Sequence, residues 1–362
     1  MVFKGTARRS AKDIALALEV LGGSLDAYTA REHTSYQARV LDEHLAQAAD
    51  VIADLCFQPA LRKADLALER KVVLEEIAMV DDTPDDLVFE LHNAALWGEH
   101  PYGYSILGTR DTVGALGTAD LRALHERAYH PGQIVVAAAG NVEHEQLLDV
   151  LAHAGWAEVP ARDVAPLVAP VPVAAPPSVH HHENDTAQVH VVFGSPTVAH
   201  GDPRRYAVGL VSMLLGGGMS SRLFQRVREE LGLAYSVYTF QSFHRDTGMH
   251  GTYVATAPET AKQATEAIRE ELARVAAEGI PEAELAMAKQ QLKGQVTLSL
   301  DSVSSRMYRA ATAELYDEPF RPLDEVLARI EAIDEDTVRE VCAEFFGPER
   351  QTVLSLGPAP AA

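Results

Sequence analysis

The sequence is short of the features that would place it in several large classes of protein. It has two cysteines, Cys56 and Cys342, which lie far apart and cannot build the disulfide framework of a small secreted domain. Its apolar runs all fall short of the ~18 residues needed to span a bilayer. We therefore expect a protein of a reducing compartment, most simply the cytoplasm, or one indifferent to redox conditions, without a membrane span.

Positive charge is also scarce. Lys and Arg number 31 against 52 Asp and Glu, which gives a formal net charge of −21. A nucleic-acid-binding surface needs a basic face, so the charge argues against a nucleic-acid partner. The charge suits a basic peptide or partner, although many soluble proteins are simply acidic.

Self-sufficient catalytic motifs are missing too. The sequence contains no H-E-x-x-H, C-x-x-C or G-x-S-x-G. The glycines at 216–218 precede an Arg-rich helix but lack the Lys-Ser/Thr pair of a phosphate-binding loop. Three successive His, 180–182, would alternate faces on a strand and cannot all bind one ion, so we predict a solvent-exposed strand end.

A proline-rich stretch divides the chain into two halves. Residues 159–179 hold six prolines in an Ala/Val background, which favours an extended, semi-rigid spacer. We therefore predict an N-terminal domain over 1–162, a linker over 163–179 and a C-terminal domain over 180–362.

Each half alternates helical and strand patterns. In the first half, Ser10 can cap a helix that Gly22 and Gly23 end, and a strand pair turns near Arg31. The first-half predictions are helices over 10–23, 42–57, 63–80 and 118–129, strands over 24–41, and a buried strand over 133–142. The second-half predictions are strands over 186–196, 234–256 and 351–358, and helices over 203–217, 220–232, 259–279 and 281–300.

The two halves resemble each other. Residues 64–77 align with 283–296 without a gap, and 26–30 correspond to 233–237. We therefore predict an α+β fold made of two homologous domains, each a mostly antiparallel sheet packed with helices.

Two acids distinguish the first copy. Glu69 and Glu76 are seven residues apart and lie on one face of a predicted helix, whereas the second copy has Ala288 and Gln295 at those positions. The pair could be a metal ligand with its supporting partner. From spacing alone, a solvated acidic face balanced by neighbouring basic residues is the simpler interpretation.

Taken together, the chain resembles the insulinase/pitrilysin family of zinc metallopeptidases, in its compact bacterial and mitochondrial-processing-peptidase form. The resemblance covers essentially the whole chain. It is carried by MVFKGT, GGSLDAYTAREHTSYQARVL, ERKVVLEEI, HPYGYSILGT, YHPGQIVVAAAGNV and SSRLFQRVREELGLAYSV. The family signature H-x-x-E-H stands directly before the first stretch. We therefore expect the two zinc-binding His and the general-base Glu to lie upstream of Met1.

The resemblance implies roles for residues that are present. Glu76 matches the third zinc ligand, and Glu69 matches the acidic residue on the same helical face. Asp26, Ala27 and Tyr28 match the edge strand that pairs with an extended substrate across a cleft between the two domains.

The second domain is expected to be non-catalytic but to reach the substrate. Arg228 and Tyr235 match the pair that contacts the substrate backbone, and Tyr235 would also help to stabilise the oxyanion, so both are counted with Glu69 among the catalytic candidates.

Two functions follow from the resemblance. One is a zinc metalloendopeptidase whose chain, as written, neither binds zinc tightly nor cleaves peptides, because one carboxylate cannot hold the metal. The other is a non-catalytic, peptide-binding partner subunit. Peptides are the expected ligands in both cases, and a dimer with itself or a related chain is compatible with either.

Overall fold

The computed structural model describes residues 1–161 and 170–358, so part of the predicted linker (163–169) lies outside the described residues. The predicted mixture of helices and sheets is confirmed, with one two-stranded and one five-stranded sheet. The described residues divide into two compact units, which take in segments from both halves of the sequence. The division into domains 1–162 and 180–362 stays a prediction.

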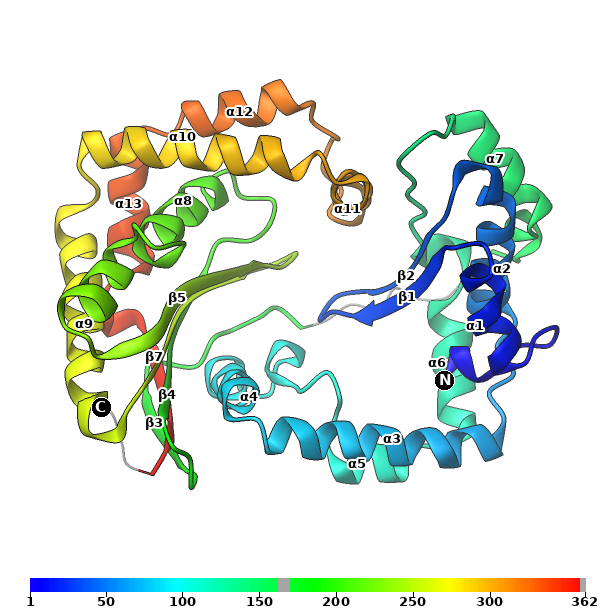
Figure 1. Cartoon of the computed structure of the whole chain (residues 1–362), viewed down its shortest axis with the longest axis horizontal. Helices are drawn as coiled ribbons and strands as arrows, with labels where there is room; N and C mark the ends of the chain where they lie inside the picture. The colour runs from blue at the N-terminus through cyan, green and yellow to red at the C-terminus, as the bar shows by residue number, and fades with distance from the viewer. Residues whose placement is uncertain (162–169, 359–362) are drawn as a thin grey trace. The chain divides into compact units, whose positions relative to one another are not determined.

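The first unit comprises residues 1–79, 105–161 and 302–315. It contains a hairpin of β1 (Ser24–Thr29) and β2 (Thr34–Arg39), which pair antiparallel as predicted. Its helices are α1 (Ala11–Glu19), α2 (Leu45–Phe57), most of α3 (Lys63–Asp81), α5 (Arg110–Ala115), α6 (Thr118–Ala128), α7 (His144–His153) and α11 (Val303–Leu315) (Figure 1).

Local sequence signals explain the start of this unit. Ser10 accepts a hydrogen bond from the Asp13 N–H while the Asp13 carboxylate accepts from the Ser10 N–H, a reciprocal capping box that begins α1. Ile14 and Leu18 then lie on one face of α1 and pack into a small core with Leu55 of α2.

The buried strand predicted over 133–142 is wrong. Residues 134–139 belong to no helix or strand, and none of them is fully buried. An apolar run forms a buried strand only when a sheet offers it a free edge and a cover. In the described part of this unit the sheet is the β1/β2 hairpin alone, and it does not pair with this segment.

The second unit comprises residues 80–104, 170–301 and 316–358. Its sheet has the order β3-β7-β4-β6-β5, parallel between β3 and β7 and antiparallel elsewhere. The strands are β3 (Val179–Glu183), β4 (Val189–Thr197), β5 (Ala234–Phe243), β6 (Gly248–Thr256) and β7 (Thr352–Gly357). The outer position and full exposure of β3 confirm the predicted solvent-exposed histidine strand.

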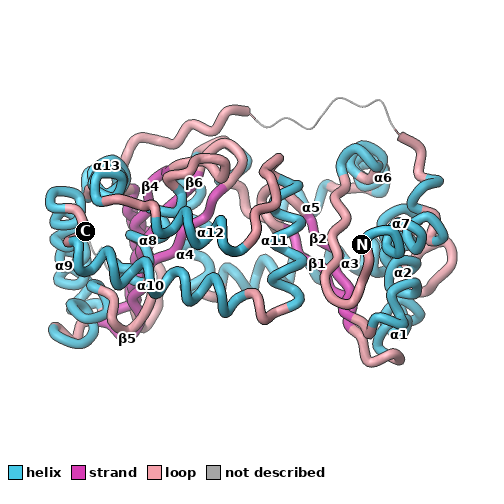
Figure 2. Tube along the Cα trace, turned by 90° about the horizontal axis from the view of Figure 1, so that it is seen from above, coloured by secondary structure: helices cyan, strands magenta, loops and turns pink. Residues whose placement is uncertain are grey.

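Helices cover both faces of this sheet (Figures 1 and 2). One face packs with α8, α9, α10 and α13 in the largest core cluster, which includes Phe193 and Val353. The other face packs on α4 through Val88. The helices are α4 (Pro84–Trp97), α8 (Arg205–Gly216), α9 (Ala261–Glu278), α10 (Glu282–Ser299), α12 (Leu323–Glu331) and α13 (Glu335–Phe345). Helix α4 was not predicted from the sequence; it belongs to the first half of the chain but completes a core of the second unit.

Within the described residues, the helices include none with the length and apolar character needed to cross a membrane. Cys56 and Cys342 are both buried as free thiols.

Candidate functional site

The two acids singled out by the sequence lie on α3, and both side chains are half-buried. Lys4 Nζ is 2.7 Å from Glu69 Oε2, and the Met1 nitrogen is 3.5 Å from Oε1. Burial alone would raise the pKa of Glu69, but the hydrogen bond from Lys4 and the two nearby positive charges together hold that pKa below its usual value. Glu69 is therefore an ionised carboxylate held by cations.

These residues do not fit a zinc ion by themselves. A catalytic zinc needs three protein ligands and an open position. Across residues 1–161 and 170–358, no group of three or more His, Cys, Asp or Glu side chains could hold a metal. The Glu69 carboxylate is moreover engaged by Lys4. The assignment of Glu76 as a ligand stays a prediction, and no catalytic step can be derived from a metal at this position.

β1 carries the predicted peptide-binding residues on an outer strand. In the described part of the chain it pairs only with β2, so its other edge offers unpaired backbone groups. Asp26 and Tyr28 are exposed and Ala27 is half-buried. The Ala27 N–H donates to Asp26 Oδ1 at 2.9 Å. A peptide carbonyl that pairs at Ala27 would therefore compete with the Asp26 carboxylate.

An aromatic and aliphatic pocket of about 320 Å³, not predicted from the sequence, adjoins this strand. Tyr28 and Tyr36 line it, and the Tyr36 and Tyr129 hydroxyls are 2.6 Å apart. Burial, and then the Tyr129 hydroxyl, raise the pKa of Tyr36, so the pair stays neutral. The other lining residues are Met1, Val2, Phe3, Ala27, Thr29, Thr34, Leu61, Leu121, Leu124, His125 and Tyr129. Because these residues are scattered through the sequence, no local pattern announces the pocket.

Arg228 and Tyr235 come together in the second unit. Arg228 lies on a π-helix, Phe224–Glu230, and its guanidinium stacks 4.7 Å from the Phe224 ring centre and 4.4 Å from that of Tyr235. Arg228 Nη1 also donates to the Tyr235 carbonyl at 3.2 Å. π-Helices are rare and occur frequently at functional sites.

A β-bulge explains why Tyr235 stands out. Ala234 pairs with Thr256 and Ser236 pairs with Ala255, so Tyr235 is the extra residue on β5. A bulge re-aims side chains, and Tyr235 is 76% exposed. The structure thus pairs Arg228 with Tyr235 in one unit and places Glu69 with Glu76 in the other.

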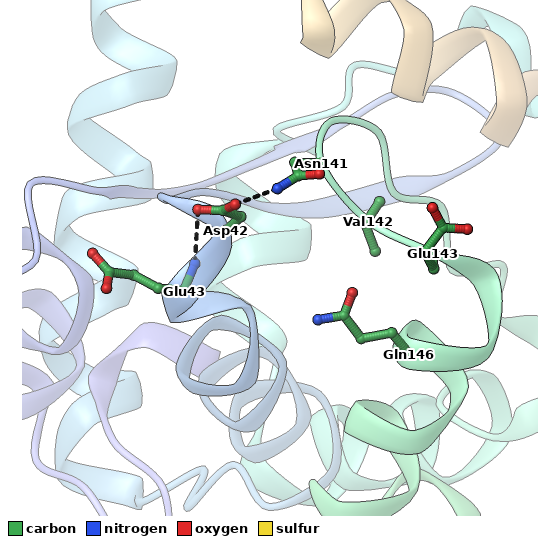
Figure 3. Close-up of a pocket in the computed structure, with 6 residues that line it drawn as sticks. All are labelled: Asp42, Glu43, Asn141, Val142, Glu143 and Gln146. Atoms are coloured by element: carbon green, nitrogen blue, oxygen red, sulfur yellow. Dashed lines mark hydrogen bonds between the residues drawn. The ribbon is translucent and has the colours of Figure 1, made fainter.

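A second, acidic pocket of about 230 Å³ lies in the first unit (Figure 3). Asp42 accepts hydrogen bonds from the Asn141 side chain and from the Glu43 N–H, and these bonds lower the pKa of Asp42. Glu143 and Gln146 lie away from this pair in Figure 3. The carboxylates do not converge, so the pocket carries no catalytic or metal-binding arrangement.

Comparisons with known proteins support a peptidase relationship. Residues 1–110 match the family model described as insulinase (peptidase family M16), and residues 115–292 match the one described as peptidase M16 inactive domain. An uncharacterized zinc protease of Streptomyces coelicolor is 39% identical over 363 residues, covering 99% of this chain and 79% of the relative. The uncharacterized zinc protease YmxG of Bacillus subtilis is 37% identical over 350 residues, covering 96% of this chain and 84% of the relative.

Solved structures share the fold. A crystal structure of a peptidase M16 inactive domain from Pseudomonas fluorescens has a TM-score of 0.92 and 22% identity, covering 99% of this chain and 86% of that one. A protease from Helicobacter pylori has a TM-score of 0.90 and 20% identity, covering 99% and 87%. At these identities the likeness establishes the two-domain architecture alone.

Proposed function

Because this chain belongs to the insulinase family (peptidase family M16), we propose that it binds extended peptides and that its fold serves their zinc-dependent internal cleavage. The observation that carries the proposal is the free edge of β1 beside an apolar pocket in the first unit. An extended peptide can add to such an edge as a further strand, with main-chain hydrogen bonds for affinity and a pocket for side-chain preference.

Each candidate residue has a role in this proposal. Ala27 and Tyr28 present backbone groups to the peptide, and Asp26 limits access to the Ala27 N–H. The half-buried Arg228 and the exposed Tyr235, stacked on each other, bind the peptide backbone as hydrogen-bond donors.

The carboxylates of α3 have different roles. Glu76 supplies one carboxylate of a zinc site that the described residues do not complete. Glu69, held by Lys4, is a positioning residue for that helical face. We expect Glu76 alone to bind zinc weakly, because a catalytic zinc needs three protein ligands.

A non-catalytic partner subunit is the second candidate. It is supported by the match of residues 115–292 to the family model described as peptidase M16 inactive domain. The two candidates differ in the zinc site. A partner subunit needs the peptide-binding surfaces, but its native protein needs no complete zinc site.

The native protein from its own cells separates the two candidates. Its intact mass, zinc content and hydrolysis of fluorescent casein would be measured, together with those of a Glu76→Gln variant expressed in the same cells. If the native protein contains zinc and hydrolyses casein, and the Glu76→Gln variant loses the zinc, the endopeptidase is established. A native chain that binds an extended peptide but shows neither property establishes the subunit. Failure to bind peptides at all would overturn both.

A further inference from the structure

β3 is the outer strand of the five-stranded sheet, and all of its residues are exposed. In the described chain it pairs with β7 alone, in parallel. It contains His180, His181 and His182. The first and third of these are the only two histidines in the whole sequence that stand two positions apart.

The middle histidine belongs to one face of the sheet. His181 pairs in register with Ser355 of β7, and its Nδ1 lies 3.0 Å from the Ser355 Oγ. Val353 of β7 faces the core formed with α8, α9 and α13. Ser355, two residues further along β7, lies on the same face of the sheet. His181 is thereby tied to that side.

The other two histidines lie on the opposite face. His180 pairs with Leu354 and His182 pairs with Leu356, and both leucines pack in the cluster formed with α4. Residues i and i+2 of a strand project from the same face. The α4 side of β3 therefore carries two adjacent, exposed imidazoles.

We propose that His180 and His182 chelate one divalent late transition-metal ion, of the class of Ni²⁺, Cu²⁺ or Zn²⁺. Cα atoms two residues apart on a strand are about 6.7 Å apart, and imidazole nitrogens bind such ions at about 2.0–2.1 Å. Two His side chains that lean toward each other span that separation. Imidazole is a preferred ligand of these metals, and water completes the coordination.

Ser178, two residues before His180, supports the chelate by contacting the His180 ring. His180 Nε2 lies 2.8 Å from Ser178 Oγ. In the tautomer in which Nε2–H donates to Ser178, Nδ1 keeps a free lone pair for the metal. Histidine ligands of metals usually hold their second nitrogen in this way, which orients the ring and strengthens the ligand. The net charge of −21 adds a long-range attraction for cations.

This site is separate from the proposed peptidase function. It lies on the second unit's sheet, whereas Glu76 lies on α3. Binding at β3 therefore requires neither a complete zinc site nor a peptide.

The test uses the full chain without an affinity tag, titrated with Ni²⁺ in a calorimeter. The wild type is expected to bind one ion. His180→Ala and His182→Ala should each weaken binding about tenfold or more, and Ser178→Ala should weaken it less. The matched control is His181→Ala, which removes the neighbouring imidazole from the other face and should change the affinity less than twofold.

Three results would overturn the proposal. One is an equal loss from His181→Ala, which would indicate chelation by an unstructured histidine run. The others are unchanged binding in the His180→Ala/His182→Ala double variant and no binding by the wild type. None of these variants alters Glu76, so this test and that of the peptidase proposal fail independently. Circular dichroism of each variant verifies that the fold is intact.

Discussion

The guanidinium of Arg228 lies 4.4 Å from the ring centre of Tyr235, and its Nη1 donates to the Tyr235 carbonyl at 3.2 Å. The pair joins two unusual backbone features, a π-helix and a β-bulge. The stacking holds a flexible cation in one orientation before any ligand binds, which reduces the entropy that binding must overcome. The pair is thus a preorganised feature of the second unit.

The first prediction concerns this stack. Arg228→Lys should weaken binding of an extended peptide about tenfold, because lysine lacks the planar guanidinium that stacks on two rings and donates at a fixed angle. Fluorescence anisotropy with a labelled peptide measures the change. Arg226→Lys is the control, since Arg226 forms an exposed pair with Glu230 on the same helix. Equal effects of the two substitutions would contradict a specific role for the stack.

The second prediction concerns the edge of β1. Asp26→Ala should tighten binding of an uncharged peptide about threefold to tenfold, because it releases the Ala27 N–H for a peptide carbonyl. Asp26→Asn keeps an acceptor oxygen without the charge and should remain close to the wild type. If Asp26→Ala leaves the affinity unchanged, the peptide does not pair at Ala27.

The third prediction concerns Asp54, whose carboxylate is fully buried in the first unit. It accepts hydrogen bonds from Thr6 at 2.7 Å, Arg8 at 3.1 Å and Arg9 at 2.6 Å. Burial alone would raise the pKa of Asp54, but these donors outweigh burial and lower it. Asp54→Asn should lower the free energy of unfolding by about 2–3 kcal/mol.

The pH dependence of this network follows from the sign of the shift. A carboxylate whose pKa is lowered in the folded state stabilises the fold above its unfolded pKa, and that stability is lost as the pH falls through the folded value. Urea unfolding of wild type at neutral and acidic pH should show this loss, and Asp54→Asn should reduce it. Asp50→Asn, at a more exposed member of the same network, should have the smaller effect.

The fourth prediction concerns His250 of β6. Its ring is fully buried against Phe346, and neither nitrogen has a hydrogen-bond partner among the described residues. Burial lowers its pKa to about 3. The unfolded state therefore takes up a proton that the folded state excludes as the pH falls below the ordinary His pKa of about 6.5. The second unit should lose about 2 kcal/mol of stability through this residue between about pH 7 and pH 5.

Thermal unfolding at the two pH values measures this effect. His250→Leu should flatten the pH dependence, because leucine fills a similar space without titrating. The remaining dependence should come in part from His92, also buried, whose pKa burial lowers to about 4 despite its contact with the Thr352 carbonyl. An unchanged pH profile in His250→Leu would show that protonation of His250 does not drive the loss.

The sequence by itself determined the local structure and the outline of the site. Ser10 predicted the start of α1, the alternating residues predicted the β1/β2 hairpin, and helical spacing placed Glu69 and Glu76 on one face of α3. Such patterns act between residues a few positions apart, so they can be recognised without a structure. The family resemblance rested on the same kind of local stretches.

Tertiary structure alone decided where those elements belong. Residues 133–142 have a strand's composition but pair with no strand among the described residues. Helix α4 packs on the second unit, where His92 contacts Thr352, 260 positions along the chain. The bulge at Tyr235 likewise arises from its pairing with β6. These outcomes depend on contacts between residues that are distant in the sequence. Such contacts form only in the folded chain, so no local pattern of residues could reveal them.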